Sequence, residues 1–190
     1  TPVGGRNFEC MSEDPYLTAM TAVEYVKGVQ SQGVASCIKH FVGNDTEFER
    51  MTIDSQIDER TLREMYMVPF ERAVLDAEVM SVMTSYNRIN GPYAADSTWL
   101  LRDVLRGEWS FDGMVVSDWF GLHSTAEGVV AGLDLEMPGP TLHRGQALID
   151  AVERGDLPAE LVRECARKIL NIMERTGGID VPPGAEITRE

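Results

Sequence analysis

Residues 113–121 read GMVVSDWFG, and this stretch decides the fold. The three apolar residues 114–116 are typical of a buried strand. The chain then turns abruptly to Asp118 and Trp119 before a glycine. A carboxylate at the tip of a buried strand is either the cap of the next helix or a group that acts on a ligand. The remainder of the sequence has to decide between the two.

The composition is that of an ordinary globular domain. The chain has 190 residues, 43% of them hydrophobic and 25% charged, which is enough for one sizeable core. A net charge of −14 argues against a nucleic-acid partner, which would require clustered Lys and Arg, and it suits a neutral or cationic small substrate. No apolar run approaches the roughly 18 residues of a membrane span, so no membrane partner is expected.

The N-terminus, TPVGGRNFE, has no Met and is not a signal peptide, so we expect a piece of a longer protein whose compartment stays open. Three widely spaced cysteines, Cys10, Cys37 and Cys165, fit neither a zinc pattern nor a disulfide framework. We expect Cys37 and Cys165 to be small buried apolar residues. No G-x-G-x-x-G follows a strand and no Walker loop occurs, so we expect no nucleotide cofactor.

Strand and helix patterns alternate along the chain. Asp14, Pro15 and Gly33 indicate the start and the end of the first helix, and Pro69 should kink the second. The expected helices span 14–32, 58–77, 97–107, 123–131, 141–154 and 158–175, and the expected strands span 34–41, 79–86, 114–119 and 133–138.

This alternation, with nearly continuous apolar strands, predicts a parallel sheet whose polar residues gather at the carboxyl ends of the strands. Arg6-Asn7 would end one further strand. The predicted fold class is α/β: a partial TIM (β/α)8 barrel with about five βα units of eight, although an open doubly wound sheet would place ligands at the same end. Residues 1–176 form the predicted barrel domain, and the Gly/Pro-rich residues 177–190 form a linker or loop toward a second domain. The polar groups are Lys39-His40, Ser85-Tyr86-Asn87, Ser117-Asp118-Trp119 and Glu136-Met137.

Taken together, these polar residues suit a sugar. Sugars are neutral and rich in hydroxyls, and their apolar faces fit an indole such as that of Trp119. Charged donors and acceptors bind the hydroxyls, and a carboxylate such as Asp118 can stabilise an oxocarbenium-like transition state or attack the anomeric carbon.

Several motifs in this order resemble the barrel domain of glycoside hydrolase family 3, the family of β-glucosidases and related exo-acting enzymes. Each motif alone is weak, and their order and spacing together are specific over about residues 4–175. The motifs are GGRNFECMSEDP (4–15), IKHFVGND (38–45), DERTLREMYMVPFE (58–71), SVMTSYNRING (81–91), FDGMVVSDWFG (111–121) and AGLDLEMP (131–138).

The resemblance implies a role for each matching residue. It implies a retaining exo-β-glycosidase that removes terminal non-reducing β-D-glucosyl residues from β-linked glucosides or oligosaccharides through a covalent glycosyl-enzyme, without a metal. A β-xylosidase, an exo-β-glucanase or a catalytically incomplete sugar-binding fragment are the alternatives. Asp118 matches the catalytic nucleophile, Trp119 an aromatic of the sugar subsite, Lys39, His40 and Arg6 the residues that bind hydroxyls, and Tyr86 the tyrosine beside the nucleophile.

Two parts of the family pattern lie outside this sequence. The resemblance implies that the first barrel strands precede residue 1 and that the general acid/base is a Glu in a second domain after residue 190. One branch of the family, the β-N-acetylhexosaminidases, instead has an Asp-His dyad on the loop after the KH strand. Here that loop, FVGNDTEFERMT (41–52), has no histidine, which argues against that branch.

Structural interpretations of the same residues stay open from the sequence. Asp118 could cap a helix, and Trp119 could belong to the core. A lysine such as Lys39 that closes an apolar strand needs a partner, either an internal carboxylate or a ligand. His40 alone would be a structural histidine, and Tyr86 could be a core tyrosine with a bonded hydroxyl.

Arg6 could pair with Glu9 or Glu13. The acidic run 45–49 is expected to be a solvated loop, with contact to substrate as the alternative. Glu136 is expected in a structural salt bridge. His123 and His143 have no metal-ligand spacing to an acid or to each other, so both are expected at the surface. A metal-dependent hydrolase built on His40, Asp118 and His123 is disfavoured, because a zinc site needs several converging ligands.

Overall fold

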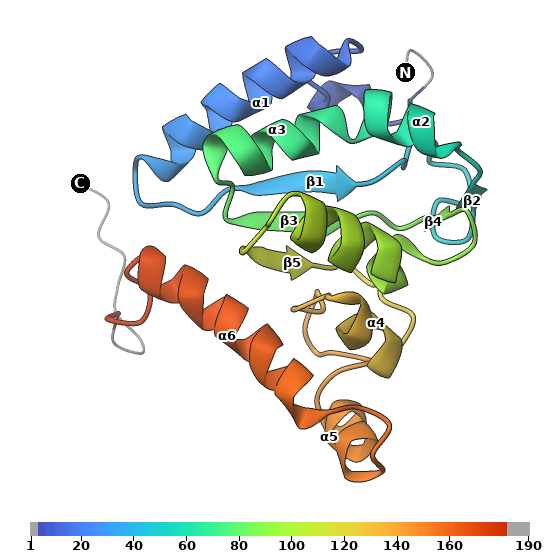
Figure 1. The fold of residues 1–190 in the computed structure, drawn as a ribbon, viewed down its shortest axis with the longest axis vertical. Coiled ribbons are helices and arrows are strands. Elements are labelled where there is room, and N and C mark those ends of the chain that lie inside the picture. The colour runs from blue at the N-terminus through green and yellow to red at the C-terminus, as the bar shows by residue number, and fades with distance from the viewer. Residues whose placement is uncertain (1–3, 182–190) are drawn as a thin grey trace.

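The computed structural model describes residues 4–181 and has an α/β fold (Figure 1). A three-stranded parallel sheet has the order β1-β3-β5, and a small second sheet pairs β2 with β4 in parallel. The carboxyl ends of the three main strands point toward the side where β2 and β4 lie (Figure 1). This arrangement confirms the predicted fold class. The strands are β1 (Cys37–Phe41), β2 (Asp54–Ser55), β3 (Ser81–Thr84), β4 (Arg88–Ile89) and β5 (Met114–Val116).

Helices cover the sheet in the alternating order that the sequence predicts. α1 packs against α3, and α3 packs against β1, whereas α4, α5 and α6 follow β5 (Figure 1). The helical segments are η1 (Asn7–Glu9), α1 (Pro15–Gln30), α2 (Glu59–Thr61), η2 (Leu62–Tyr66), α3 (Val68–Ala77), η3 (Ala94–Asp96), η4 (Trp99–Glu108), α4 (Ala126–Ala131), α5 (Gln146–Glu153) and α6 (Ala159–Arg175).

The ends of α1 are those that the sequence predicts. The side chain of Asp14 accepts a hydrogen bond from the backbone N–H of Leu17 at 2.7 Å, and Pro15 occupies the first helical position, where no N–H is needed. The chain leaves the helix through Gly33, whose φ of 74° lies in the left-handed region that glycine adopts without strain.

The second predicted helix, 58–77, is broken rather than kinked. Asp58 caps its start through the N–H of Thr61 at 3.0 Å. The N–H of Met67 then bonds to the carbonyl of Leu62, five residues back, at 2.8 Å, and α3 begins immediately afterwards with Pro69 in its first turn. A proline lacks the N–H that a continuous helix requires, so the wide turn ends one helix and the next begins.

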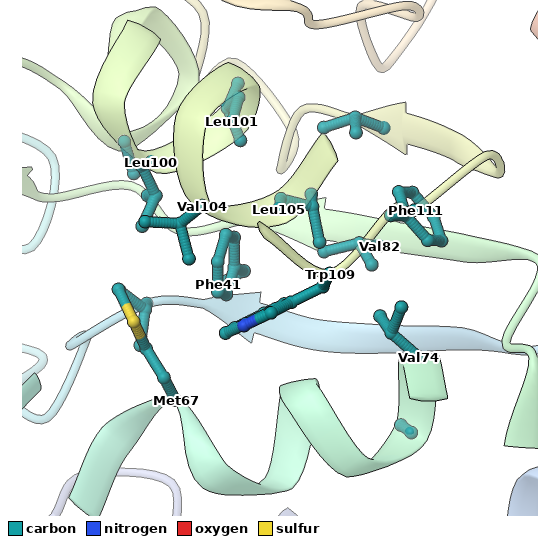
Figure 2. Close-up of a cluster of buried hydrophobic side chains, with 14 of the residues drawn as sticks. Phe41, Met67, Val74, Val82, Leu100, Leu101, Val104, Leu105, Trp109 and Phe111 are labelled. Atoms are coloured by element: carbon teal, nitrogen blue, oxygen red, sulfur yellow. The ribbon is translucent and has the colours of Figure 1, made fainter. Parts of the chain in front are cut away.

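The main core lies between the sheet and its covering helices (Figure 2). Phe41 at the end of β1 is fully buried, with its ring 5.0 Å from that of Phe70 and 5.8 Å from that of Trp109. Truncating such a buried aromatic to alanine typically costs about 3–5 kcal/mol of stability. The same core cluster includes the aliphatic side chains of Val74, Val82, Leu100, Leu101, Val104 and Leu105 (Figure 2).

Several predicted elements differ in the structure. The segment 133–138 forms only a single bridge, between Leu135 and Val116, instead of a full strand. Residues Arg6 and Asn7, expected to end a strand, lead into the short turn η1. Both segments lie beside β1 or β5 at the outside of the sheet, where no further strand among residues 4–181 supplies the hydrogen bonds that hold a strand straight. The parallel pair β2 and β4 was not predicted, since each strand has only two residues.

One of the two cysteines predicted to be buried is buried in the structure, and the other is exposed. Cys165 is buried, as predicted, but Cys37 is exposed because the outer side of β1 is open within residues 4–181. No helix in the described part of the chain is long and apolar enough to cross a membrane. Most of the predicted linker, 182–190, lies outside the described residues.

Candidate active site

The tip of β5 is anchored by backbone hydrogen bonds. The N–H of Ser117 donates to the carbonyl of Leu135, and its hydroxyl oxygen accepts from the N–H of Met137, both at 2.9 Å. Phe120, with a φ of 64°, donates its N–H to the carbonyl of Met137 at 2.9 Å. This turn fixes the backbone on both sides of Asp118.

Asp118 is 7% exposed, and its two oxygens have different surroundings. Oδ1 accepts a hydrogen bond from the N–H of Trp119 at 2.7 Å. Oδ2 lies 3.3 Å from Nε2 of His40 and receives no hydrogen bond of normal geometry from residues 4–181. The next helix, α4, begins only at Ala126, so the interpretation of Asp118 as a helix cap is wrong.

An irregularity in β1 brings Lys39 and His40 to the same place. Between Ile38 and Phe41, β1 contains one residue more than the facing segment of β3. In a regular strand, consecutive side chains point to opposite faces, and a bulge redirects them. Lys39 and His40 therefore both line a cavity of about 200 Å³, together with Arg6 and Glu9.

His40 connects this cavity with Asp118. Burial, first of all, lowers the pKa of His40, and the charges of Lys39 and Arg6 act in the same direction. The carboxylates of Asp118 and Glu9 offset only part of this effect. The imidazole is therefore neutral at neutral pH, and Asp118 has a polar neighbour without a full positive charge.

Tyr86 approaches Asp118 from the end of β3. Burial, followed by the neighbouring Asp118 carboxylate, raises the pKa of Tyr86 to about 12, so that the phenol keeps its proton. Gly121 leaves room for this approach, because a methyl group there would lie 3.2 Å from Cδ1 of Tyr86 and 3.2 Å from the carbonyl oxygen of Asp118. The guanidinium carbon of Arg50 lies 4.7 Å from the centre of the Tyr86 ring, a cation–π contact.

Two cations of the cavity lining, Arg6 and Lys39, share the carboxylate of Glu9. Glu9 Oε1 lies 2.6 Å from Nε of Arg6, and Oε2 accepts a hydrogen bond from Nζ of Lys39 at 3.2 Å. Of the two partners that the sequence allowed for Arg6, the structure selects Glu9. Lys39 has the internal carboxylate that a lysine in this position needs.

The other polar residues after β3 hold the backbone. Ser85 donates its hydroxyl to the carbonyl of Val42 at 2.9 Å, and the Asn87 amide donates to the carbonyls of Val42 and Gly43 at 3.3 Å each. Of the group 85–87, therefore, Tyr86 alone turns toward Asp118.

The acidic run 45–49 is only partly the solvated loop that the sequence predicts. Glu47 and Glu49 are exposed, but Asp45 accepts a hydrogen bond from the hydroxyl of Tyr66 at 2.5 Å. Glu47 also pairs with Arg50 at 2.8 Å, which anchors this loop beside Tyr86.

Three other candidate residues, Trp119, Glu136 and His123, differ in their exposure and in their contacts. Trp119 follows Asp118 but is 54% exposed, so it is not the core residue that the sequence allowed. Glu136 is buried and accepts the backbone N–H groups of Leu142, His143 and Arg144 at 2.9–3.2 Å, so the predicted salt bridge is wrong. His123 is exposed and stacks on Tyr93, with 3.8 Å between the ring centres.

Among residues 4–181, no group of three or more His, Cys, Asp or Glu side chains is arranged to hold a metal ion.

Comparison with known protein families identifies the chain. The model of the glycosyl hydrolase family 3 N terminal domain matches residues 1–172. The chain belongs to glycosyl hydrolase family 3.

Relatives and solved structures of this family share both sequence and fold with the chain. A beta-glucosidase of Rhizobium radiobacter is 60% identical over 181 residues, which are 95% of this chain and 22% of that protein. The structure of beta-glucosidase 3B from Thermotoga neapolitana in complex with glucose is 45% identical with a TM-score of 0.87, and the match covers 92% of this chain and 26% of that one. A beta-glucosidase from Kluyveromyces marxianus in complex with glucose is 44% identical with a TM-score of 0.86, and the match covers 92% and 22%. The chain thus spans about a quarter of the length of these family 3 proteins.

Sequence reasoning missed Arg50 and gave Glu9 no role of its own. The three-residue spacing of Arg6 and Glu9 indicated one ion pair, but the second, with Lys39, joins residues 30 positions apart. Arg50 follows the acidic run 45–49, and its contact with the Tyr86 ring joins two segments that no local pattern relates.

Proposed function

We propose that the protein containing this chain is a retaining exo-β-glycosidase that hydrolyses terminal non-reducing β-D-glucosyl residues. The observation that supports this most is the Asp118 carboxylate at the carboxyl end of a parallel strand. One of its oxygens is held by the Trp119 N–H at 2.7 Å, and the other lies 3.3 Å from neutral His40. That relatives of this chain are named beta-glucosidase supports glucose as the sugar of the substrate.

In the first step, Oδ2 of Asp118 attacks the anomeric carbon as the bond from that carbon to the leaving oxygen breaks. A general acid gives its proton to the leaving oxygen, and a glycosyl ester of Asp118 remains. In the second step, water attacks the same carbon and loses its proton to the same group, now a base. The ester bond breaks, Asp118 regains its charge, and the sugar leaves with its original configuration.

The surrounding residues orient the carboxylate and bind the sugar. The Trp119 N–H holds Oδ1, and the protonated phenol of Tyr86, with its pKa of about 12, is a donor beside the reacting carboxylate. Arg6, Lys39 and His40 line the adjoining cavity, where their N–H groups bind the hydroxyls of the terminal sugar. The exposed indole of Trp119 covers an apolar face of the ring.

The general acid/base belongs to a part of the protein outside this chain. Two acids near the sheet ends are already engaged, since Glu9 pairs with two cations and Glu136 accepts three backbone N–H groups. The chain's share of its relatives, 22% of the Rhizobium radiobacter protein, leaves ample length for a second domain.

Covalent trapping tests the proposal on the full-length protein. A 2-deoxy-2-fluoro glucoside with a good leaving group should inactivate the enzyme, and peptide mass analysis should locate one sugar on a peptide that contains Asp118. A label on a peptide that lacks Asp118 would contradict the proposal, and so would hydrolysis without any trapped intermediate and with inverted configuration.

A further inference from the structure

We propose that Glu9 is a positioning residue for sugar binding, because its single carboxylate aligns Arg6 and Lys39. The inference rests on the function proposed above and deepens it. It assigns to Glu9 the task of holding two cationic side chains, from two separate segments, in the geometry that binds sugar hydroxyls.

Each oxygen of the Glu9 carboxylate contacts one of the two cations. Oε1 lies 2.6 Å from Nε of Arg6, which precedes η1, and Oε2 lies 3.2 Å from Nζ of Lys39, which belongs to β1. Both cations keep donors for a ligand after pairing with Glu9. A guanidinium has four N–H donors besides that on Nε, and an ammonium has three donors in all.

The local backbone does not need the Glu9 side chain to keep its shape. The turn at residues 6–10 is closed by the hydrogen bonds from the N–H of Glu9 to the carbonyl of Arg6, at 3.2 Å, and from the N–H of Cys10 to the carbonyl of Asn7, at 3.1 Å. The Glu9 side chain instead contacts Arg6 and Lys39, and it lines the cavity together with Arg6, Lys39 and His40.

The charges around Glu9 agree with this role. Burial alone would raise the pKa of Glu9, but the hydrogen bond and charge of Lys39, together with the charge of Arg6, lower it overall. The carboxylate is therefore ionised at neutral pH. Without it, two long positively charged side chains would repel each other and lose their common anchor, since each has many rotamers.

Glu9→Gln in the full-length protein keeps the size of the side chain and removes the charge. We expect the Kd of glucose, measured by calorimetry, to rise at least about tenfold, and the KM of an aryl β-glucoside to rise with it while kcat changes less. Glu13→Gln is the matched control, because Glu13 is an exposed acid of the same segment. We expect this control to bind and to turn over like the unaltered protein.

Two further measurements separate positioning from a general structural role. Since Glu9 acts through both Arg6 and Lys39, Glu9→Gln should cost less in the Lys39→Met background, where only the contact with Arg6 remains, than in the unaltered protein, so that the two changes are non-additive. A set of monodeoxy glucosides, each lacking one sugar hydroxyl, gives the second measurement. For at least one hydroxyl, its removal should raise KM by a smaller factor in Glu9→Gln than in the unaltered protein.

The outcomes also distinguish this inference from the proposed function. If the unaltered protein hydrolyses the glucoside and Glu9→Gln matches Glu13→Gln in Kd and KM, the role of Glu9 is refuted while the function stands. Additive effects of Glu9→Gln and Lys39→Met refute it as well. If the unaltered protein neither binds glucose nor hydrolyses the glucoside, both proposals fail together.

Discussion

Nε2 of His40 lies 3.3 Å from Oδ2 of Asp118, and this contact reaches across the middle strand of the sheet. His40 belongs to β1 and Asp118 follows β5, with β3 between them. The contact forms because a bulge turns His40 toward the strand ends and because the turn after β5 is fixed to residues 135–137. The surroundings of the Asp118 carboxylate thus depend on both outer strands of the sheet.

Replacing Asp118, the proposed nucleophile, should nearly abolish turnover. We expect Asp118→Asn in the full-length protein to lower kcat for an aryl β-glucoside by at least about 10³-fold, because an amide cannot form the glycosyl ester. In Asp118→Ala, azide should restore turnover and yield the α-glycosyl azide, since the small anion attacks the side of the sugar that Asp118 has left open. Asp112→Asn, which changes an exposed acid just before the same strand, is the control. Azide without effect, or a β-glycosyl azide as product, would argue against Asp118.

The neutral state of His40 predicts how stability depends on pH. Because burial lowers its pKa, the folded protein binds fewer protons than the unfolded protein once the pH falls below about 6.5, the usual pKa of histidine. The unaltered protein should therefore lose stability relative to His40→Asn as the pH falls from about 7 to about 5, and the difference should be constant above about pH 7.5. Urea unfolding of both proteins at each pH measures this difference in the free energy of unfolding. A relative gain of stability in acid would reverse the sign and refute the neutral assignment.

Tyr86 should contribute as a donor and not as a titrating group. We expect Tyr86→Phe to lower kcat by about 10²-fold, because a hydrogen-bond donor beside the reacting carboxylate is lost. Since the pKa of Tyr86 is about 12, the alkaline limb of the kcat profile should stay where it is in the unaltered protein. Tyr16→Phe, at an exposed tyrosine, is the control. An alkaline limb that shifts in Tyr86→Phe would mean that the phenol ionises in the working range.

Much of the architecture could be predicted because it depends on local chemistry. The cap at Asp14 and the stop at Gly33 each depend on a few neighbouring residues, and the apolar run before Asp118 determines β5. The disturbance at Pro69 was predicted for the same reason, although as a kink and not as a break. The segment 133–138 alternates apolar residues with Asp134 and Glu136, but it forms only the bridge between Leu135 and Val116. The length of a strand depends on its hydrogen bonds to a neighbouring strand, which no local pattern shows.

The details of the candidate site were less accessible, because they depend on contacts between distant segments. No local pattern indicates that β1 has an extra residue at Lys39 and His40 relative to β3. The pairing of Lys39 with Glu9 and the stacking of Arg50 on Tyr86 likewise depend on the fold as a whole.

The ion pair between Arg106 and Asp134, which lies beside β5, should matter more for stability than for catalysis. Asp134 accepts hydrogen bonds from Arg106 and from the N–H of Val115, both at 2.7 Å, and its side chain is 4% exposed. We expect Asp134→Asn to destabilise the fold by about 1.5–3 kcal/mol, because the half-buried guanidinium of Arg106 loses a charge-assisted hydrogen bond. Asp156→Asn removes the exposed pair with Arg154 and should change stability by less than about 1 kcal/mol. Thermal and urea unfolding of the full-length variants measure both, and equal effects would contradict the ranking.

The open edge of β1 predicts self-association of the 190-residue chain when it is produced by itself. Among residues 4–181, β1 bonds only to β3, and a groove of about 1020 Å³ with apolar residues such as Tyr25, Ile38 and Phe70 runs beside it. Unpaired strand edges join other chains, so light scattering under reducing conditions should show dimers or larger species. Cys37→Lys places a charge on this exposed edge and should shift the chain toward monomer, whereas Ser31→Lys, at the exposed end of α1, should not. A monomer with one cooperative unfolding transition would show that the edge is already satisfied.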